Sequence, residues 1–121
     1  MDASQYSRYT QLYTGDVPEM LSGILKEADW QSCIDLGCGD GALLSSLTNG
    51  GYLDGKSVYA VDLSESRLEL VSQINPEIIC LPADVCDVPI DGSSVDVVMS
   101  TQVIEHVDDD AQMAKEIYRI A

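Results

Sequence analysis

The segment "CIDLGCGDGALL" runs from Cys33 to Leu44 and places three glycines and two acids between two apolar runs. The first run is short and ends in the glycines, as buried strands often do, whereas "ALLSSL" beyond them has a helical pattern. The segment therefore predicts a strand, a glycine-rich loop and a helix in succession. Glycine loops at such junctions usually bind phosphate, which the two carboxylates would repel.

Apolar runs and helical patterns alternate along the rest of the chain. Further strands are predicted at 57–63, 77–83 and 95–100. Further helices are predicted at 16–28, 64–74 and 108–121. The strand segments are apolar nearly throughout, which is typical of strands buried on both faces of a parallel sheet. The alternation predicts an α/β fold with a Rossmann-like, doubly wound parallel sheet.

Local signals predict the ends and faces of the helices. Asp16 and Glu19 are spaced as a capping box with Pro18 in the first turn, and Ser64 is the expected N-cap of its helix. The last helix carries an apolar stripe at helical spacing, formed by Met113, Ala114, Ile117, Tyr118 and Ala121.

Charge and cysteine usage exclude several classes of partner. Twenty-one acids against six bases give a formal charge of −15, which argues against binding to nucleic acid or to an anionic membrane. An alternative interpretation is that the excess acid is only a solubility device. The four cysteines form no CxxC pair, and no stretch of eighteen apolar residues or signal peptide occurs. These features predict a cytoplasmic protein with reduced thiols.

The acids near the glycine loop suggest the ligand. Asp62 ends the second predicted strand, 21 residues after Gly41, where a carboxylate can accept hydrogen bonds from both ribose hydroxyls. Asp35 and Asp40 would repel a pyrophosphate but suit a ligand that carries an ammonium and a sulfonium. S-adenosylmethionine has a ribose, no phosphate and a positive reactive end, so it is the predicted cofactor.

Four motifs then occur in order: "IDLGCGDGALL", "VYAVDLSESRLEL", "LPADVCDVPIDGSSVDVVMS" and "TQVIEHV". Together they resemble the class I S-adenosylmethionine-dependent methyltransferases of the methyltransferase domain 11 type, a broad group acting on small molecules, quinones and lipids. The resemblance runs from about residue 33 to 121 and implies a methyltransferase with strand order 3-2-1-4. It divides the single domain of 1–121 into an arm and helix (1–30) and a cofactor-binding part (31–121). This part is called a half-fold because relatives continue with further strands.

The resemblance also implies roles for individual residues. The loop that holds the methionine part of the cofactor is matched by Asp35, Gly37, Cys38, Gly39 and Gly41. The contacts to ribose and adenine are matched by Asp62, Leu63, Asp84 and Val85. In the last pair, Asp84 accepts from the adenine amino group and the Val85 backbone N–H donates to the ring. The stretch near the transferred methyl is matched by Ser100, Thr101 and Gln102.

His106 is the candidate catalytic base, because a histidine titrates near neutral pH. A second interpretation is that "EHV" starts a helix and shapes the pocket. "VIEHV" also resembles metal-assisted methyltransferases in which an acid precedes "VxEH". Gln102 stands at that position here, and a neutral amide is a weak metal ligand, so no metal site is expected.

Two functional classes remain open on the sequence alone. The first is an enzyme, or the cofactor-binding part of one, that methylates a small-molecule acceptor. The second is a non-catalytic S-adenosylmethionine-binding or partner-dependent module. An NAD-dependent dehydrogenase ranks far behind both, because it needs GxGxxG. Strand 95–100 is expected at an apolar sheet edge without guarding lysines or prolines, which predicts self-association through that edge or through helix 108–121.

Overall fold

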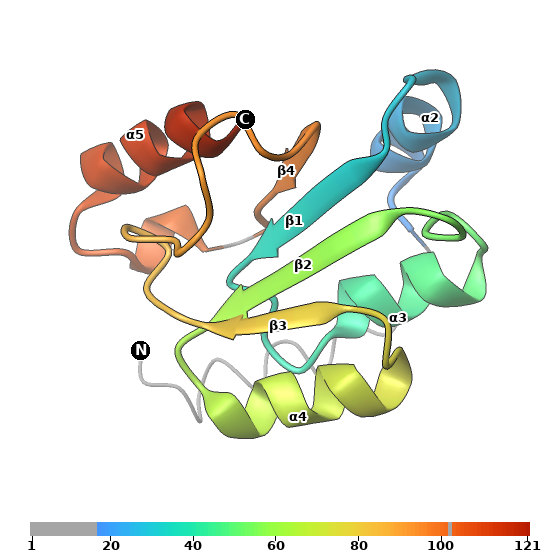
Figure 1. Ribbon diagram of the computed structural model, residues 1–121, viewed down its shortest axis with the longest axis horizontal. Helices are drawn as coiled ribbons and strands as arrows, with labels where there is room; N and C mark the ends of the chain where they lie inside the picture. The colour runs from blue at the N-terminus through green and yellow to red at the C-terminus, as the bar shows by residue number, and fades with distance from the viewer. Residues whose placement is uncertain (1–16, 102) are drawn as a thin grey trace.

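The computed structural model describes residues 17–101 and 103–121, and the predicted arm of residues 1–16 lies outside this range. Its centre is a parallel four-stranded sheet in the order β3-β2-β1-β4, which confirms the expected 3-2-1-4 order (Figure 1). The strands are β1 (Ser32–Leu36), β2 (Ser57–Asp62), β3 (Ile79–Pro82) and β4 (Val97–Met99).

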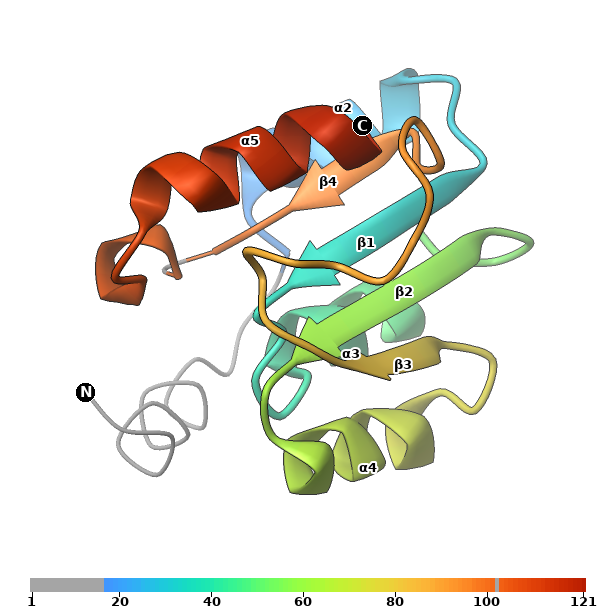
Figure 2. The same cartoon turned by 60° about the vertical axis from the view of Figure 1, so that its left-hand side comes forward.

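Helices cover both faces of the sheet. On one face lie α2 (Glu19–Glu27), α3 (Ala42–Asn49) and α4 (Glu65–Ile74), and on the other lies α5 (Asp110–Ile120), which is preceded by a 3₁₀ turn, η1 (Ile104–His106). Figure 2 shows α5 in front of the strands and α3 behind them. No helix in the described part of the chain is long and apolar enough to cross a membrane.

Alternate residues of each strand enter two separate cores. Cys33 and Val58 are register partners and pack towards α2, α3 and α4. Ile34, Leu36 and Val61 point the other way and pack with residues of α5 and of the irregular segment 84–96. Burial on both faces explains why the strand segments are apolar nearly throughout.

The first described helix starts later than predicted. Pro18 is its N-cap residue in an extended conformation, without a side-chain cap, and Glu19 is the first helical residue. The predicted capping box is therefore wrong, because Glu19 lies at the wrong position to close it, and Asp16 is outside the described residues. The predicted N-cap of α4 is confirmed, since the Ser64 hydroxyl accepts from the Arg67 N–H at 3.4 Å.

The predicted apolar stripe of α5 is also wrong in part. Met113 is buried as expected, but Tyr118 is 87% exposed and Ala114 and Ala121 are exposed as well. The buried face continues instead through Glu116 and Ile120. A glutamate can occupy this face because its carboxylate is paired with Arg119 and accepts a backbone N–H.

Candidate functional site

The glycine loop after β1 requires glycine for two reasons. Gly37, Gly39 and Gly41 all have positive φ angles, of 72°, 60° and 91°. A Cβ atom on Gly37 would also lie 2.8 Å from a methyl of Val103. The loop turns tightly against β2, because the N–H groups of Gly37 and Cys38 both donate to the Val61 carbonyl. The backbone can thus pass close beneath anything bound above it.

Asp62 ends β2 beside this loop, and the surrounding residues orient its carboxylate. One oxygen accepts the Gly39 N–H at 3.0 Å, and the other accepts the Ser64 N–H at 2.9 Å. Arg67 Nη1 lies 3.8 Å from the first oxygen, and both side chains are more than nine-tenths buried. The carboxylate is therefore held in one orientation before any ligand arrives.

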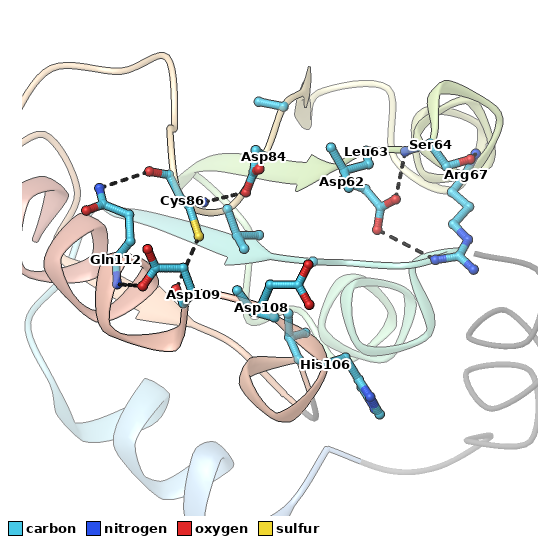
Figure 3. A pocket seen from close by; sticks show the side chains of 15 residues that line it. Asp62, Leu63, Ser64, Arg67, Asp84, Cys86, His106, Asp108, Asp109 and Gln112 are labelled. Carbon is cyan, nitrogen blue, oxygen red and sulfur yellow. Dashed lines mark hydrogen bonds and ion pairs between the residues drawn. The ribbon is translucent and has the colours of Figure 1, made fainter. Parts of the chain in front are cut away.

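A cavity of about 450 Å³ opens at the carboxyl ends of the strands, where ligands of open α/β sheets bind. Figure 3 shows side chains from β2, α4, segment 83–86 and the start of α5 around it. The predicted site residues that line it are Gly37, Asp62, Leu63, Asp84, Val85 and His106. Its wall is acidic, because Asp108 and Asp109 add to Asp62 and Asp84 while the lining contains one arginine, Arg67.

The other predicted residues that the structure describes lie outside the lining. Asp35 is buried in β1 and Cys38 is buried within the loop, and Gly39 and Gly41 belong to the same loop. Thr101 is exposed and does not line the cavity. Gln102 falls outside the described residues, so its predicted role stays a prediction.

Asp35 is a buried acid on the central strand. It is 2% exposed, and its Oδ1 atom has no hydrogen-bond partner among the described residues. Burial, with a smaller contribution from the Asp62 carboxylate, raises the pKa of Asp35 to about 7. Burial likewise raises the pKa of the Cys38 thiol far above its usual range. A thiol that stays protonated is a poor nucleophile, which supports a space-filling role for Cys38.

Asp84 begins a tight turn on the opposite wall of the cavity. Its Oδ1 atom accepts the Cys86 N–H at 2.8 Å, which closes the turn over Val85. Helix α5 holds the far end of the turn, because Gln112 Nε2 donates to the Cys86 carbonyl at 3.2 Å. The Cys86 thiol also donates to the Asp109 carbonyl at 3.5 Å (Figure 3).

His106 lies in η1 at the edge of the cavity. Its Nε2 atom is 3.8 Å from a carboxylate oxygen of Glu105, and both side chains are at least one-third exposed. In Figure 3 the imidazole lies apart from the Asp84–Cys86 side of the cavity. Among the described residues, no group of three or more His, Cys, Asp or Glu side chains is arranged to hold a metal ion.

Several lining residues were not anticipated from the sequence. Arg67 belongs to the first turn of α4. Asp109 is the N-cap of α5, Asp108 precedes it, and Gln112 lies in its first turn. A general signal was available, because helices that follow parallel strands begin at the ligand-binding edge of the sheet. That signal indicates which turns approach the cavity, but it does not indicate which side chains face it.

The glycine loop, the carboxylate at the end of β2 and the cavity beyond the strands define a protein of Rossmann-like architecture with a candidate ligand site at the carboxyl edge of its sheet. Residues 34–121 match the family described as "Methyltransferase domain", and the chain belongs to that family.

Curated relatives agree with this assignment. Over 90 residues the chain is 31% identical to the "Probable S-adenosylmethionine-dependent methyltransferase Rv3030" of Mycobacterium tuberculosis. That alignment covers 72% of this chain and 30% of the relative. The chain thus spans less than a third of the length of this relative.

Solved structures share the fold. The "putative s-adenosyl-l-methionine-dependent methyltransferase (mmp1179)" of Methanococcus maripaludis superposes with a TM-score of 0.77 at 26% identity, covering 98% of this chain and 57% of that one. A "putative methyltransferase" solved in complex with the Trm112 methyltransferase activator of Haloferax volcanii has a TM-score of 0.66 at 25% identity, with coverage of 83% and 46%.

Proposed function

We propose that this chain binds S-adenosylmethionine in the cavity and forms the cofactor-binding part of a cytoplasmic methyltransferase for a small-molecule acceptor. The observation that carries the proposal is the oriented carboxylate of Asp62, which faces the cavity opposite Asp84. Asp62 would accept the ribose hydroxyls. The exposed side chain of Leu63 would lie against the adenine, and Asp84 and Val85 would bind its polar edge.

Two buried polar atoms at the same edge of the sheet also lack partners in the described part of the chain. Asp35 Oδ1 and Ser100 Oγ are buried at the carboxyl ends of the neighbouring strands β1 and β4, without hydrogen-bond partners among the described residues. Buried polar atoms normally find partners, but neither residue lines the cavity, so they support the proposal less directly than Asp62 does. The acidic wall favours a ligand with an ammonium and a sulfonium over one with phosphates.

The cofactor, when bound, supplies a methyl group that its sulfonium already activates for in-line displacement. The protein then has to align the acceptor and exclude water. His106 is the candidate base that takes a proton from an oxygen or nitrogen acceptor. Its place at the edge of the cavity suits this task, and no metal is needed for it.

Replacement of Asp62 tests the proposal. Asp62→Ala removes the charge-assisted hydrogen bonds to the ribose, a loss of roughly 1.5–3 kcal/mol in binding free energy, and should weaken binding of S-adenosylhomocysteine about ten- to a hundredfold. Titration calorimetry measures the dissociation constant, and Asp54→Ala, an exposed acid in the α3–β2 turn, is the matched control. Equal affinities of wild type and Asp62→Ala would refute the ribose assignment.

A non-catalytic or partner-dependent module is the second candidate. The fold shared with a methyltransferase that was solved with an activator protein favours it. Methyl-transfer assays on the whole protein, alone and with added cell extract, distinguish the two classes. Binding of NAD in place of S-adenosylhomocysteine would instead support a dehydrogenase, and loss of transfer activity in a chelator would contradict the metal-free mechanism.

A further inference from the structure

The turn formed by Asp84, Val85 and Cys86 lies in a segment with no helix or strand of its own. Between β3 and β4, residues 83–96 form only turns and bends, and Asp84 is exposed. Within the turn, the Cys86 N–H donates to Asp84 Oδ1 at 2.8 Å and the Asp87 N–H donates to the Asp84 carbonyl at 3.0 Å. These bonds shape the turn itself, whereas its place relative to the cavity is set by contacts from outside the segment, among them the Ala83 N–H bond to the Asp62 carbonyl at 3.1 Å.

Helix α5 provides further contacts along one face. Gln112 donates to the Cys86 carbonyl, Glu116 accepts the Val88 N–H at 2.6 Å, and Arg119 donates to the carbonyls of Val88 and Ile90, both at 2.8 Å. Positions 112, 116 and 119 are four and three residues apart, so they lie in one row on the helix. The row runs along segment 86–90.

We infer that Gln112 is a positioning residue for nucleobase recognition, because it fixes the Asp84–Cys86 turn from α5. The inference rests on the proposed function, in which this turn binds the adenine edge. Gln112 is the member of the row nearest the turn, and Asp109 Oδ1 accepts its backbone N–H at 3.0 Å, which fixes the start of α5. The Gln112 side-chain amide donates to the Cys86 carbonyl, so it affects the adenine contacts of Asp84 and Val85 only by holding the turn in place.

The choice between adenine and hypoxanthine depends on the placement of this turn. Adenine presents an amino donor beside a ring acceptor, which complements a carboxylate acceptor and a backbone N–H donor. Hypoxanthine presents a carbonyl acceptor beside a ring N–H donor, so the same pair of groups opposes it. A turn that is free to shift loses this discrimination, whereas contacts to the ribose remain.

The test compares S-adenosylhomocysteine with S-inosylhomocysteine by titration calorimetry on the full chain. Gln112→Leu keeps the size of the side chain but removes the donor, and should reduce the preference for the adenosyl ligand roughly three- to tenfold. If the leucine variant does not fold, Gln112→Glu is the second test. Its side chain also lacks a donor but is favourable in a first helical turn, so it should reduce the preference in the same way. Gln73→Leu, on the exposed side of α4, is the control and should leave the preference unchanged.

The outcomes separate the inference from the proposed function. Asp62→Asn should weaken binding of both ligands to the same extent, because they share the ribose. An unchanged preference in both folded Gln112 variants, beside a clear preference in the wild type, would overturn the role of Gln112 alone. A wild type that binds both ligands equally would overturn the adenine assignment of Asp84 and Val85, and the inference with it.

Discussion

Asp35 combines full burial with a neighbouring carboxylate, and this makes it an acid that resists ionisation. The folded protein raises its pKa from 3.8 to about 7, so the native state binds this proton more tightly than the unfolded chain does. The contribution of Asp35 to stability is therefore greatest near pH 4 and declines as the pH rises to about 7. Above that pH Asp35 is ionised in the folded protein as well, and its contribution to stability is completely lost.

Asp35→Asn should remove this pH dependence. The amide has the shape of the neutral acid and carries no charge, so the variant should be more stable than the wild type near pH 8 by up to about 4 kcal/mol, and similar to it near pH 4. Urea unfolding at the two pH values measures the difference, with Asp54→Asn as the exposed control. A variant less stable than the wild type near pH 8 would contradict the pKa shift.

Cys86 offers a chemical probe of the cavity. It lines the cavity and is half-buried, whereas Cys80 on β3 is similarly buried but lies outside the lining. Saturating S-adenosylhomocysteine should therefore slow alkylation of Cys86 and leave Cys80 unaffected. Because burial and the nearby Asp84 raise the pKa of Cys86, labelling is best done above about pH 8 and followed by peptide mass spectrometry. Equal rates for Cys86 with and without ligand would mean that the ligand binds elsewhere.

At the scale of elements, α5 acts as a support for the irregular segment 84–96. Glu116 is 5% exposed, and its hydrogen bonds with Arg119 and the Val88 N–H lower its pKa. A lowered pKa means that this acid stabilises the fold above its ordinary pKa of 4.5, and that the contribution is lost as the pH falls through the lowered value. The attachment of segment 84–96 to α5 thus depends on the buried carboxylate of Glu116.

Glu116→Gln should destabilise the protein by roughly 1.5–3 kcal/mol at neutral pH, because the hydrogen bonds to a charged group become neutral ones. The difference from the wild type should shrink in acid. Amide hydrogen exchange at Val88 should accelerate more than exchange in β1, which reports the local loosening. Glu69→Gln, on the exposed side of α4, serves as the control. A uniform rise in exchange across the protein would argue against a local support.

At the scale of the molecule, the sheet has an open edge at β4. Among the described residues β4 pairs only with β1, and residues 95–100 contain no lysine or proline. Asp96 donates its N–H to Ser32 of β1, so by alternation the N–H of Val97 points away from the sheet. Such an edge can pair with a second chain.

We predict that the chain self-associates through this edge, as measured by sedimentation velocity across a concentration series. Val97→Pro removes an outward donor without breaking the ladder to β1, and should shift the protein towards the monomer. Tyr118→Ser tests the other surface considered for association, the exposed side of α5, and should have no effect. A wild type that stays monomeric at high concentration would show that the edge is protected.

The strand order was expected from the family resemblance, whereas the sequence by itself determined the fold class and the glycine loop with an acid at the end of the next strand. These features depend on local backbone geometry and on apolar periodicity, which neighbouring residues reveal. Only the tertiary structure decided that Arg67 faces Asp62 inside the cavity, that Glu116 replaces Tyr118 on the buried face of α5, and that Gln112 holds Cys86. The α5 contacts join residues 26 or more positions apart. A polar side chain is buried or exposed according to such distant partners, and periodicity along one helix does not contain them.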